Sequence, residues 1–203
     1  MLPSRFILMG VMIYIVLELV GSICLQYIPS LQNKEQIVIT VMRLCELLGF
    51  IFLIKQFGMV ESLGLSKPTT QDVRIFATIS SICLLIVAVL YGVQQQWFQL
   101  IKTPEWLYGI IGLFLMVVLA PVVEELVFRG LVYRMLREQW GVAVSIVVSA
   151  LFFSLLHHGL IISPQFAGGI IFALAYEWSR SLWVSIALHM GANSAVYVLA
   201  MLR

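Results

Sequence analysis

Residues 105–134 read EWLYGIIGLFLMVVLAPVVEELVFRGLVYR. The part of this stretch from Trp106 to Val123 holds no charged residue, and its 18 residues match the length that marks a membrane-spanning helix. Lipid offers no hydrogen-bond partners to backbone N–H and C=O groups, so such a segment must satisfy them internally as a helix. The stretch therefore predicts a transmembrane helix that carries charged residues directly after Val123.

The composition of the whole chain agrees with a membrane protein. Of its 203 residues, 62% are hydrophobic and only 11% are charged, whereas a soluble domain has about 25% charged residues. A globular fold of this size has too little interior to bury so much apolar surface. The net charge of +2 and the absence of a basic run exclude a nucleic-acid partner. We expect the lipid bilayer to surround most of the chain.

Seven apolar stretches along the chain are candidates for membrane spans. Turn or charge signals separate them, for example Lys67-Pro68, Gly141 and Ser163-Pro164. The stretches are solidly apolar rather than alternating, which favours helices over a β-barrel. We therefore predict an all-α, polytopic transmembrane bundle of about seven spans. The predicted spans are residues 6–28, 36–57, 74–93, 105–134, 142–161, 165–179 and 182–202.

The distribution of lysine and arginine predicts how the bundle is oriented. With the N-terminus in the cytoplasm, eight of these residues in loops fall on the cytoplasmic side and three fall outside. Cytoplasmic loops of membrane proteins carry such an excess. We expect a cytoplasmic N-terminus and an external C-terminus.

Ionisable side chains at membrane depth cost about 2.5–3.5 kcal/mol each on insertion scales, so each is a candidate functional residue. In the first half, only Glu18, Arg43 and Glu46 lie inside predicted spans, none with a second kind of polar partner nearby. We expect Arg43 and Glu46, three residues apart, to form a local ion pair. In the second half the polar residues gather in three short segments. They are Glu124, Glu125, Arg129, His157, His158, His189 and Asn193.

Helical spacing predicts which of these residues share a face. Glu125 and Arg129 are four apart and lie on one face, so we expect them to pair. Glu124 points about 100° away and is free to face the interior of the bundle. His189 and Asn193 are also four apart, which places an imidazole and an amide on one face.

The same spacing relates Phe153 to His157. At 1.5 Å per residue, Glu124, His157, His189 and Asn193 lie at depths of about 15, 18, 10 and 17 Å from the inner boundary. This estimate requires the helix of the quoted stretch to continue to its end. We therefore expect the four side chains to meet at similar depth, as an active site or a transport site.

Three motifs occur in order on successive hydrophobic spans. They are Glu124-Glu125-x-x-x-Arg129, Phe153-x-x-x-His157 and His189-x-x-x-Asn193. This order resembles the CPBP intramembrane endopeptidases, which include the type II CAAX prenyl endopeptidases and the abortive-infection-like bacterial membrane proteases. The resemblance covers about residues 104–200, so we divide the chain into N-terminal helices of unknown role (1–103) and a catalytic core (104–203). Arg180 departs from it, because relatives often have glycine there, and the FxxxH spacing selects His157 over His158.

The resemblance implies hydrolysis of a peptide bond inside the membrane. Glu124 would then act as the base that activates a water molecule, with His157 orienting that water. His189 and Asn193 would donate hydrogen bonds to the oxyanion of the tetrahedral intermediate. The supporting residues would be Glu125, Arg129 and Phe153.

A zinc-dependent mechanism uses the same residues. The family is commonly described as metal-dependent, and Glu124, His157 and His189 could ligate zinc. The chain has no HExxH motif. The sequence leaves open whether His189 stabilises the oxyanion or binds a metal.

The resemblance implies a membrane-associated protein or hydrophobic peptide as substrate. A prenylated tail is the substrate class of the eukaryotic relatives, but this short chain looks like a bacterial plasma-membrane protein, so we expect a juxtamembrane segment instead. One alternative is a proteolytically inactive scaffold or immunity-type protein, yet no motif residue is lost. The other is a small proton-coupled transporter, which would be expected to show two similar halves. Here the polar residues gather in one half.

Overall fold

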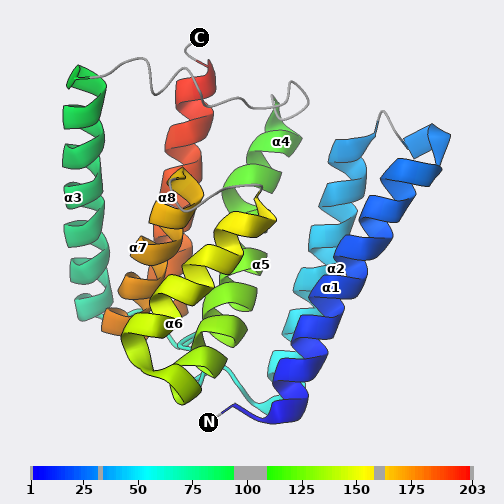
Figure 1. The fold of residues 1–203 in the computed structure, drawn as a ribbon, viewed down its shortest axis with the longest axis horizontal. Helices are drawn as coiled ribbons and strands as arrows, with labels where there is room; N and C mark the ends of the chain where they lie inside the picture. The colour runs from blue at the N-terminus through cyan, green and yellow to red at the C-terminus, as the bar shows by residue number, and fades with distance from the viewer. Residues whose placement is uncertain (1, 32–33, 94–108, 158–162, 202–203) are drawn as a thin grey trace.

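The computed structural model describes residues 2–31, 34–93, 109–157 and 163–201 of the chain (Figure 1). Within these residues all regular structure is helical and no β-strand occurs, which confirms the predicted all-α class. The elements are α1 (Ser4–Tyr27), η1 (Pro29–Leu31), α2 (Glu35–Phe57), α3 (Thr70–Val93), α4 (Ile110–Phe114), η4 (Leu115–Leu119), α5 (Ala120–Glu125), η5 (Leu126–Tyr133), α6 (Arg134–Leu156), α7 (Pro164–Ser179) and α8 (Leu182–Met201).

Five helical stretches within the described residues are long and apolar enough to cross a membrane. One of them, Ile110–Leu156, is 47 residues long and contains a sharp break, so its two arms correspond to the predicted spans 105–134 and 142–161. The predicted span 165–179 is α7, which has only 16 residues. The chain is thus a multi-pass membrane protein, and the total of about seven spans stays a prediction.

The break in the long helical stretch lies at Gly141. Its backbone has φ 76° and ψ −179°, a conformation that side chains with a Cβ rarely adopt. The Ser145 hydroxyl donates a hydrogen bond to the Gly141 carbonyl and stabilises the start of the next helical arm. The chain reverses direction at this point (Figure 1), and the second arm of α6 packs against η5 and α7.

Two π-helical segments flank α5 in the first arm of this stretch. η4 precedes α5 and η5 follows it. The helix continues through both segments, so α4, η4, α5 and η5 form one continuous helical rod, residues 110–133. π-helical turns inside helices are frequent at functional sites. Glu124 and Glu125 stand at the end of α5, between the two π-helical segments.

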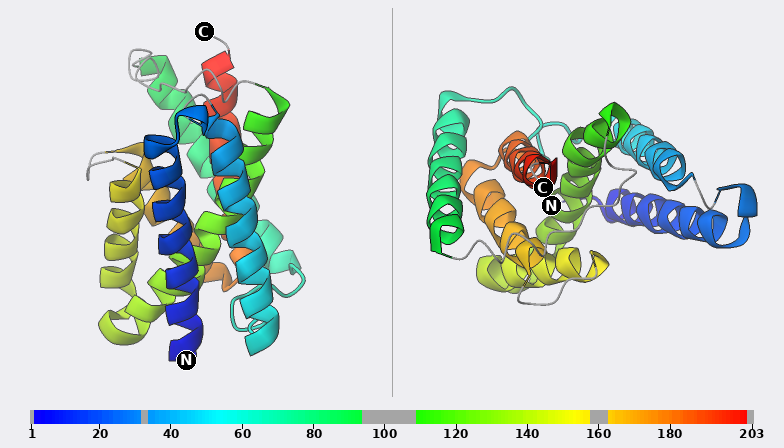
Figure 2. Two further views of the ribbon diagram at one scale, coloured as in Figure 1. Left: turned by 90° about the vertical axis from the view of Figure 1, so that its right-hand side faces the viewer. Right: turned by 90° about the horizontal axis from the view of Figure 1, so that it is seen from above.

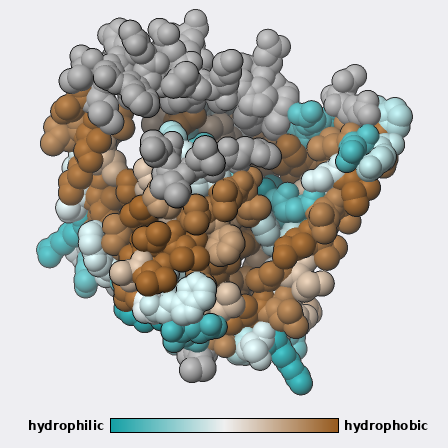
Figure 3. Space-filling model, viewed as in Figure 1, coloured by the Kyte–Doolittle hydropathy of each residue, from teal (hydrophilic) through white to brown (hydrophobic). Residues whose placement is uncertain are grey.

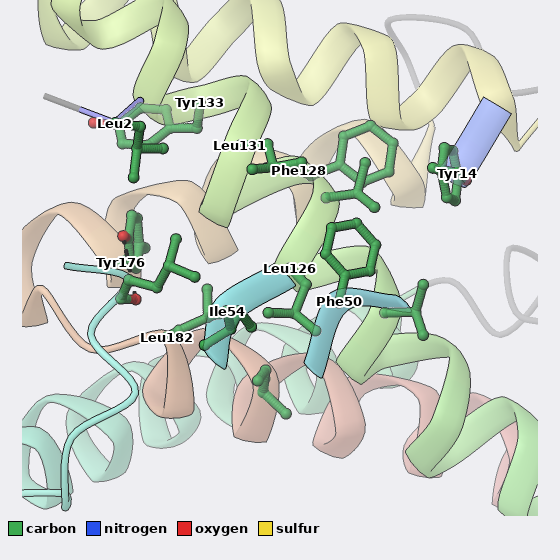
Figure 4. Packing of buried hydrophobic residues seen from close by; sticks show 14 of the residues in the cluster. Leu2, Tyr14, Phe50, Ile54, Leu126, Phe128, Leu131, Tyr133, Tyr176 and Leu182 are labelled. Carbon is green, nitrogen blue, oxygen red and sulfur yellow. Dashed lines mark hydrogen bonds between the residues drawn. The ribbon is translucent and has the colours of Figure 1, made fainter. Parts of the chain in front are cut away.

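The core is built around η5. Figure 4 shows Phe50 and Ile54 of α2 close to Leu126 of η5, and all three are buried. Tyr14 of α1 packs against Phe128 with ring centroids 6.5 Å apart. Seen from above, the α1–α2 hairpin flanks the α4–α5 rod on one side, while α3 stands at the opposite edge of the bundle (Figure 2). There α3 packs against α7 and α8.

The surface and the termini agree with a protein that crosses the bilayer. The flanks of the bundle are covered mainly by hydrophobic side chains, and hydrophilic atoms are visible in the hollow between the α1–α2 hairpin and the other helices (Figure 3). α1 begins and α8 ends at opposite ends of the bundle (Figure 1). Which end faces the cytoplasm stays a prediction.

The loop between α2 and α3 is anchored to the turn between α7 and α8. The Gly64 carbonyl accepts a hydrogen bond from the Leu182 N–H at 2.9 Å, and the Leu65 carbonyl accepts one from the Trp183 indole N–H at 3.0 Å. Gly64 has φ +71°, and a Cβ there would lie 2.1 Å from the Arg180 carbonyl oxygen. This loop therefore has a structural role that its polar composition did not reveal.

We expect Gly64→Ala to destabilise the protein more than Gly58→Ala. Both glycines have positive φ, so alanine adds about 1–2 kcal/mol of backbone strain at either position. A Cβ at Gly58 meets nothing within 4 Å, whereas one at Gly64 collides with backbone, which adds about 1–3 kcal/mol. Thermal unfolding in detergent measures the difference, and equal losses in the two variants would contradict the close packing of the loop on Arg180.

Candidate active site

Three helices bring a glutamate and two histidines together. Glu124 lies at the end of α5, His157 immediately follows the last residue of α6, and His189 lies in α8. Glu124 Oε2 is 3.7 Å from Nε2 of His157 and 3.7 Å from Nε2 of His189. These distances are too long for direct hydrogen bonds, but they allow all three groups to contact one small molecule.

The other nitrogen of each imidazole faces a hydrogen-bond acceptor. Nδ1 of His157 lies 2.8 Å from the Phe153 carbonyl oxygen, and Nδ1 of His189 lies 2.8 Å from Glu125 Oε1. A carbonyl and a carboxylate accept hydrogen bonds, so Nδ1 carries the proton in both rings. In a neutral imidazole the lone pair then lies on Nε2, the atom that faces Glu124.

The three side chains of the site differ in their exposure to solvent. The Glu124 side chain is 7% exposed and the His189 side chain 4%, whereas the His157 side chain is 34% exposed. A small molecule or peptide can therefore approach along His157. His158, the alternative histidine of the doubled pair, lies outside the described residues.

Glu125 is the centre of a buried polar network. The predicted pair with Arg129 is formed, with Arg129 Nη1 at 2.9 Å from Glu125 Oε1, and both side chains are fully buried. Glu125 also accepts hydrogen bonds from Nδ1 of His189 and from the Ser185 hydroxyl. Arg129 Nη2 donates to the Gly169 carbonyl of α7 at 2.9 Å. Glu125 therefore does more than neutralise Arg129, because it also holds the ring of His189.

Aromatic rings fix the orientation of the charged groups. The Arg129 guanidinium lies 5.1 Å from the ring centroid of Phe153 and 5.4 Å from that of Phe172. The Phe153 ring also contacts the His157 ring, with centroids 4.5 Å apart, and the Phe172 ring stacks on that of His189, with centroids 4.6 Å apart. Phe153 thus contacts both Arg129 and His157, which gives a physical reason for the FxxxH pattern.

Asn193 has a different partner from the one expected. Its side-chain Nδ2 donates a hydrogen bond to the Met116 carbonyl of η4 at 2.8 Å. The residue lies one helical turn beyond His189 on α8 and is partly buried. The structure brings Glu124, Glu125, His157 and His189 together, whereas Asn193 contacts the rod that precedes Glu124.

A zinc site would use the same donor atoms. As the side chains stand, the part of the chain that the structure describes contains no group of three or more His, Cys, Asp and Glu side chains that could hold a metal ion. In this arrangement Glu124, His157 and His189 do not form a metal site.

Sequence reasoning missed several partners of these residues. Ser185 carried a signal, because it lies four residues before His189 on the same helical face. The carbonyls of Gly169 and Met116 carried none, since any residue type supplies a carbonyl. Neither could the pattern reveal which helices would place these atoms opposite a donor.

The charged residues of the first half were described incompletely by the sequence. Arg43 pairs with Glu46 at 2.6 Å as expected, but its Nη1 also lies 2.7 Å from Glu18 Oε1 of α1. The sequence did not reveal the contact with Glu18, which forms because the α1–α2 hairpin brings two helices together. α2 also packs against α5, and the Arg43 charge interacts with that of Glu124. The N-terminal helices thus border the candidate site.

The family comparison covers the part of the chain that holds this site. Residues 104–195 match the family described as type II CAAX prenyl endopeptidase Rce1-like. A membrane-embedded CAAX protease of Staphylococcus aureus (strain USA300), MroQ, is 34% identical over 100 residues. That match covers 46% of this chain and 40% of the relative, so the chain spans less than half of its length. No solved structure matches. Residues 104–195 are thus similar to the type II CAAX prenyl endopeptidases, and part of the chain is similar to a bacterial membrane-embedded CAAX protease.

Proposed function

We infer that the protein hydrolyses a peptide bond within or at the edge of the membrane, with Glu124 as the base that activates water. The observation that carries this proposal is the position of Glu124 Oε2, 3.7 Å from the Nε2 atoms of both histidines. Each histidine is held through its Nδ1 by an acceptor, which leaves Nε2 free to act toward Glu124. The family of residues 104–195 supports the same reaction class.

The proposed reaction begins with a water molecule between Glu124 and His157. Glu124 removes a proton as the water oxygen attacks the peptide carbonyl carbon, and the carbonyl electrons move to the oxygen. Nε2 of neutral His157 accepts the second hydrogen bond of the water and orients it. Glu124 then passes its proton to the amide nitrogen, and the C–N bond breaks. General base catalysis of this kind contributes about 10²–10⁴-fold in rate.

His189 can serve the oxyanion only in its protonated form. Its Nδ1 already donates to Glu125, so Nε2 can donate as well only when the ring is an imidazolium. The Glu125 carboxylate accepts the hydrogen bond from Nδ1 and so orients the ring with Nε2 toward Glu124, as the acidic partner of a hydrolytic triad does. As a zinc ligand, His189 would instead be neutral with its lone pair on Nε2. The two mechanisms therefore require different charge states of His189, positive for the oxyanion role and neutral for the zinc ligand.

Metal content separates these two roles. We expect His189→Ala to lower kcat by about 10²–10³-fold while bound zinc per protein stays at the wild-type level in both His189→Ala and Asn193→Ala. Metal analysis of purified wild type and both variants, beside their cleavage rates, measures this. Asn193 is a poor zinc ligand and serves as the internal control. Stoichiometric zinc in wild type and Asn193→Ala that is missing from His189→Ala would overturn the oxyanion role.

The proposed substrate is a membrane-associated protein or hydrophobic peptide cut in its juxtamembrane segment. The reacting groups lie in a bundle with apolar flanks, so a substrate that already resides at the membrane reaches them most readily. The transporter alternative is disfavoured because the polar cluster draws its residues from one half of the chain. The scaffold alternative is disfavoured because every motif residue is present.

Purified protein in lipid nanodiscs, incubated with a library of membrane-segment peptides, tests the proposal. Mass spectrometry of the products should show cleaved peptides with wild type and none with Glu124→Ala. Cleavage that persists unchanged in the variant would remove Glu124 from the mechanism. A wild type that cleaves nothing but moves protons with a solute in proteoliposomes would favour the transporter.

A further inference from the structure

The helical rod before Glu124 contains a carbonyl that its own backbone cannot satisfy. In an α-helix the Met116 carbonyl would accept a hydrogen bond from the Ala120 N–H, but in η4 that N–H donates to Leu115. In a π-helix the donor would be the N–H of residue 121, five positions on. Residue 121 is proline, which has no N–H. The Met116 carbonyl is therefore left without a main-chain donor.

Asn193 supplies the missing donor from another helix. α8 packs against η4, and Nδ2 of Asn193 donates to the Met116 carbonyl at 2.8 Å. A carbonyl removed from water without a partner costs about 1–3 kcal/mol. The hydrogen bond therefore stabilises the π-helical turn at the place where Pro121 leaves it incomplete.

The register of this turn controls where Glu124 points. A π-helical turn holds roughly one residue more than an α-helical turn, and one residue corresponds to about 100° of rotation about the helix axis. Glu124 follows Pro121 by three residues in the same rod. If η4 relaxed to α-helical register, the Glu124 side chain would rotate by about that angle relative to the helix before it.

We propose that Asn193 is a positioning residue: its amide replaces the N–H that Pro121 lacks and so holds the register that aims Glu124 at the two histidines. This role differs from direct donation to the oxyanion, which the family pattern suggests for the same side chain. Its catalytic consequence rests on the proposed hydrolysis, whereas the stabilising hydrogen bond does not. The two parts can be measured separately.

A double-mutant cycle with Asn193→Ala and Pro121→Ala tests the proposal. Pro121→Ala returns a main-chain N–H at position 121, so the Met116 carbonyl gains a donor that does not depend on Asn193. The measurements are kcat, KM and the melting temperature of the full-length protein in nanodiscs. Ser194→Ala is the matched control, because the Ser194 hydroxyl donates to the Met190 carbonyl of its own helix.

We expect Asn193→Ala in the otherwise wild-type chain to lower kcat about tenfold or more, to leave KM nearly unchanged and to lower the melting temperature. In the Pro121→Ala background the same substitution should lower kcat by less than about twofold and leave the melting temperature unchanged, since contacting residues show such non-additivity. Ser194→Ala should change neither kcat nor KM.

Two results would overturn the proposal. Equal melting-temperature losses in both backgrounds would show that the bond to Met116 is not what Asn193 contributes. If the kcat penalty stays the same in both backgrounds while the melting temperature recovers, Asn193 acts directly on the reacting atoms. A wild type without cleavage would refute the proposed hydrolysis, and the melting-temperature cycle would still decide whether Asn193 replaces the missing N–H.

Discussion

Glu124→Gln is expected to lower kcat/KM for peptide cleavage by about 10²–10⁴-fold while the amount and the melting temperature of the protein stay near wild type. Glutamine has the same shape, but its neutral amide cannot take a proton from water. Glu124 Oε2 has two imidazole neighbours at 3.7 Å and no direct hydrogen bond to them, so the substitution removes little stability from the folded protein. Kinetics on a cleaved library peptide and thermal unfolding measure the two effects.

Glu18→Gln is the matched control for this prediction. Glu18 is also a glutamate in a membrane helix. Its partner Arg43 keeps a second carboxylate, because Arg43 Nη1 also lies 2.6 Å from Glu46 Oε2. We expect near-normal cleavage by this variant. Equal loss of activity in both variants would show that any carboxylate change in the membrane disables the protein, and would remove the specific role of Glu124.

Arg129→Met is expected to cause the largest loss of folded protein, with a destabilisation of about 3–5 kcal/mol. The substitution leaves the fully buried Glu125 carboxylate without its cation and removes the donor to the Gly169 carbonyl. Fluorescence-detected size exclusion and thermal unfolding measure the amount and stability of folded protein. Adding Glu125→Gln removes the stranded charge, so the double variant should recover part of the loss.

Glu124→Ala is the comparison variant for this prediction. Glu124→Ala should leave abundance near normal, because Glu124 stands outside the buried ion pair. If Glu124→Ala and Arg129→Met lose expression equally, the three acidic and basic residues of this segment form a single structural network. Arg129→Met with wild-type stability would contradict the account of the pair.

The helices were predictable because their physical cause is local. Apolar length sets a membrane span, and the predicted stretches 6–28 and 36–57 correspond closely to α1 and α2. The two π-helical segments were not predictable, because they depend on packing of the rod against α8, α6 and the N-terminal hairpin. Hydropathy alone would also end the fourth helix at Val123, whereas the helix continues through η5, where the buried Arg129 pairs with Glu125.

Part of the site followed from helical periodicity. The spacing of Glu125 and Arg129 predicts their pair, and the spacing of Phe153 and His157 predicts their contact. The bond between Asn193 and the Met116 carbonyl did not follow, because a carbonyl has no signature in the sequence and the contact joins residues 77 positions apart.

One measurement tests most directly whether Glu124 and His157 act on one water molecule. It compares kcat/KM for one cleaved peptide among wild type, Glu124→Gln, His157→Ala and the double variant. Groups that work as one unit show strongly non-additive losses. The account predicts that the double variant is within about twofold of the slower single variant. If the two losses multiply in the double variant, Glu124 and His157 act independently, and the proposed site is contradicted.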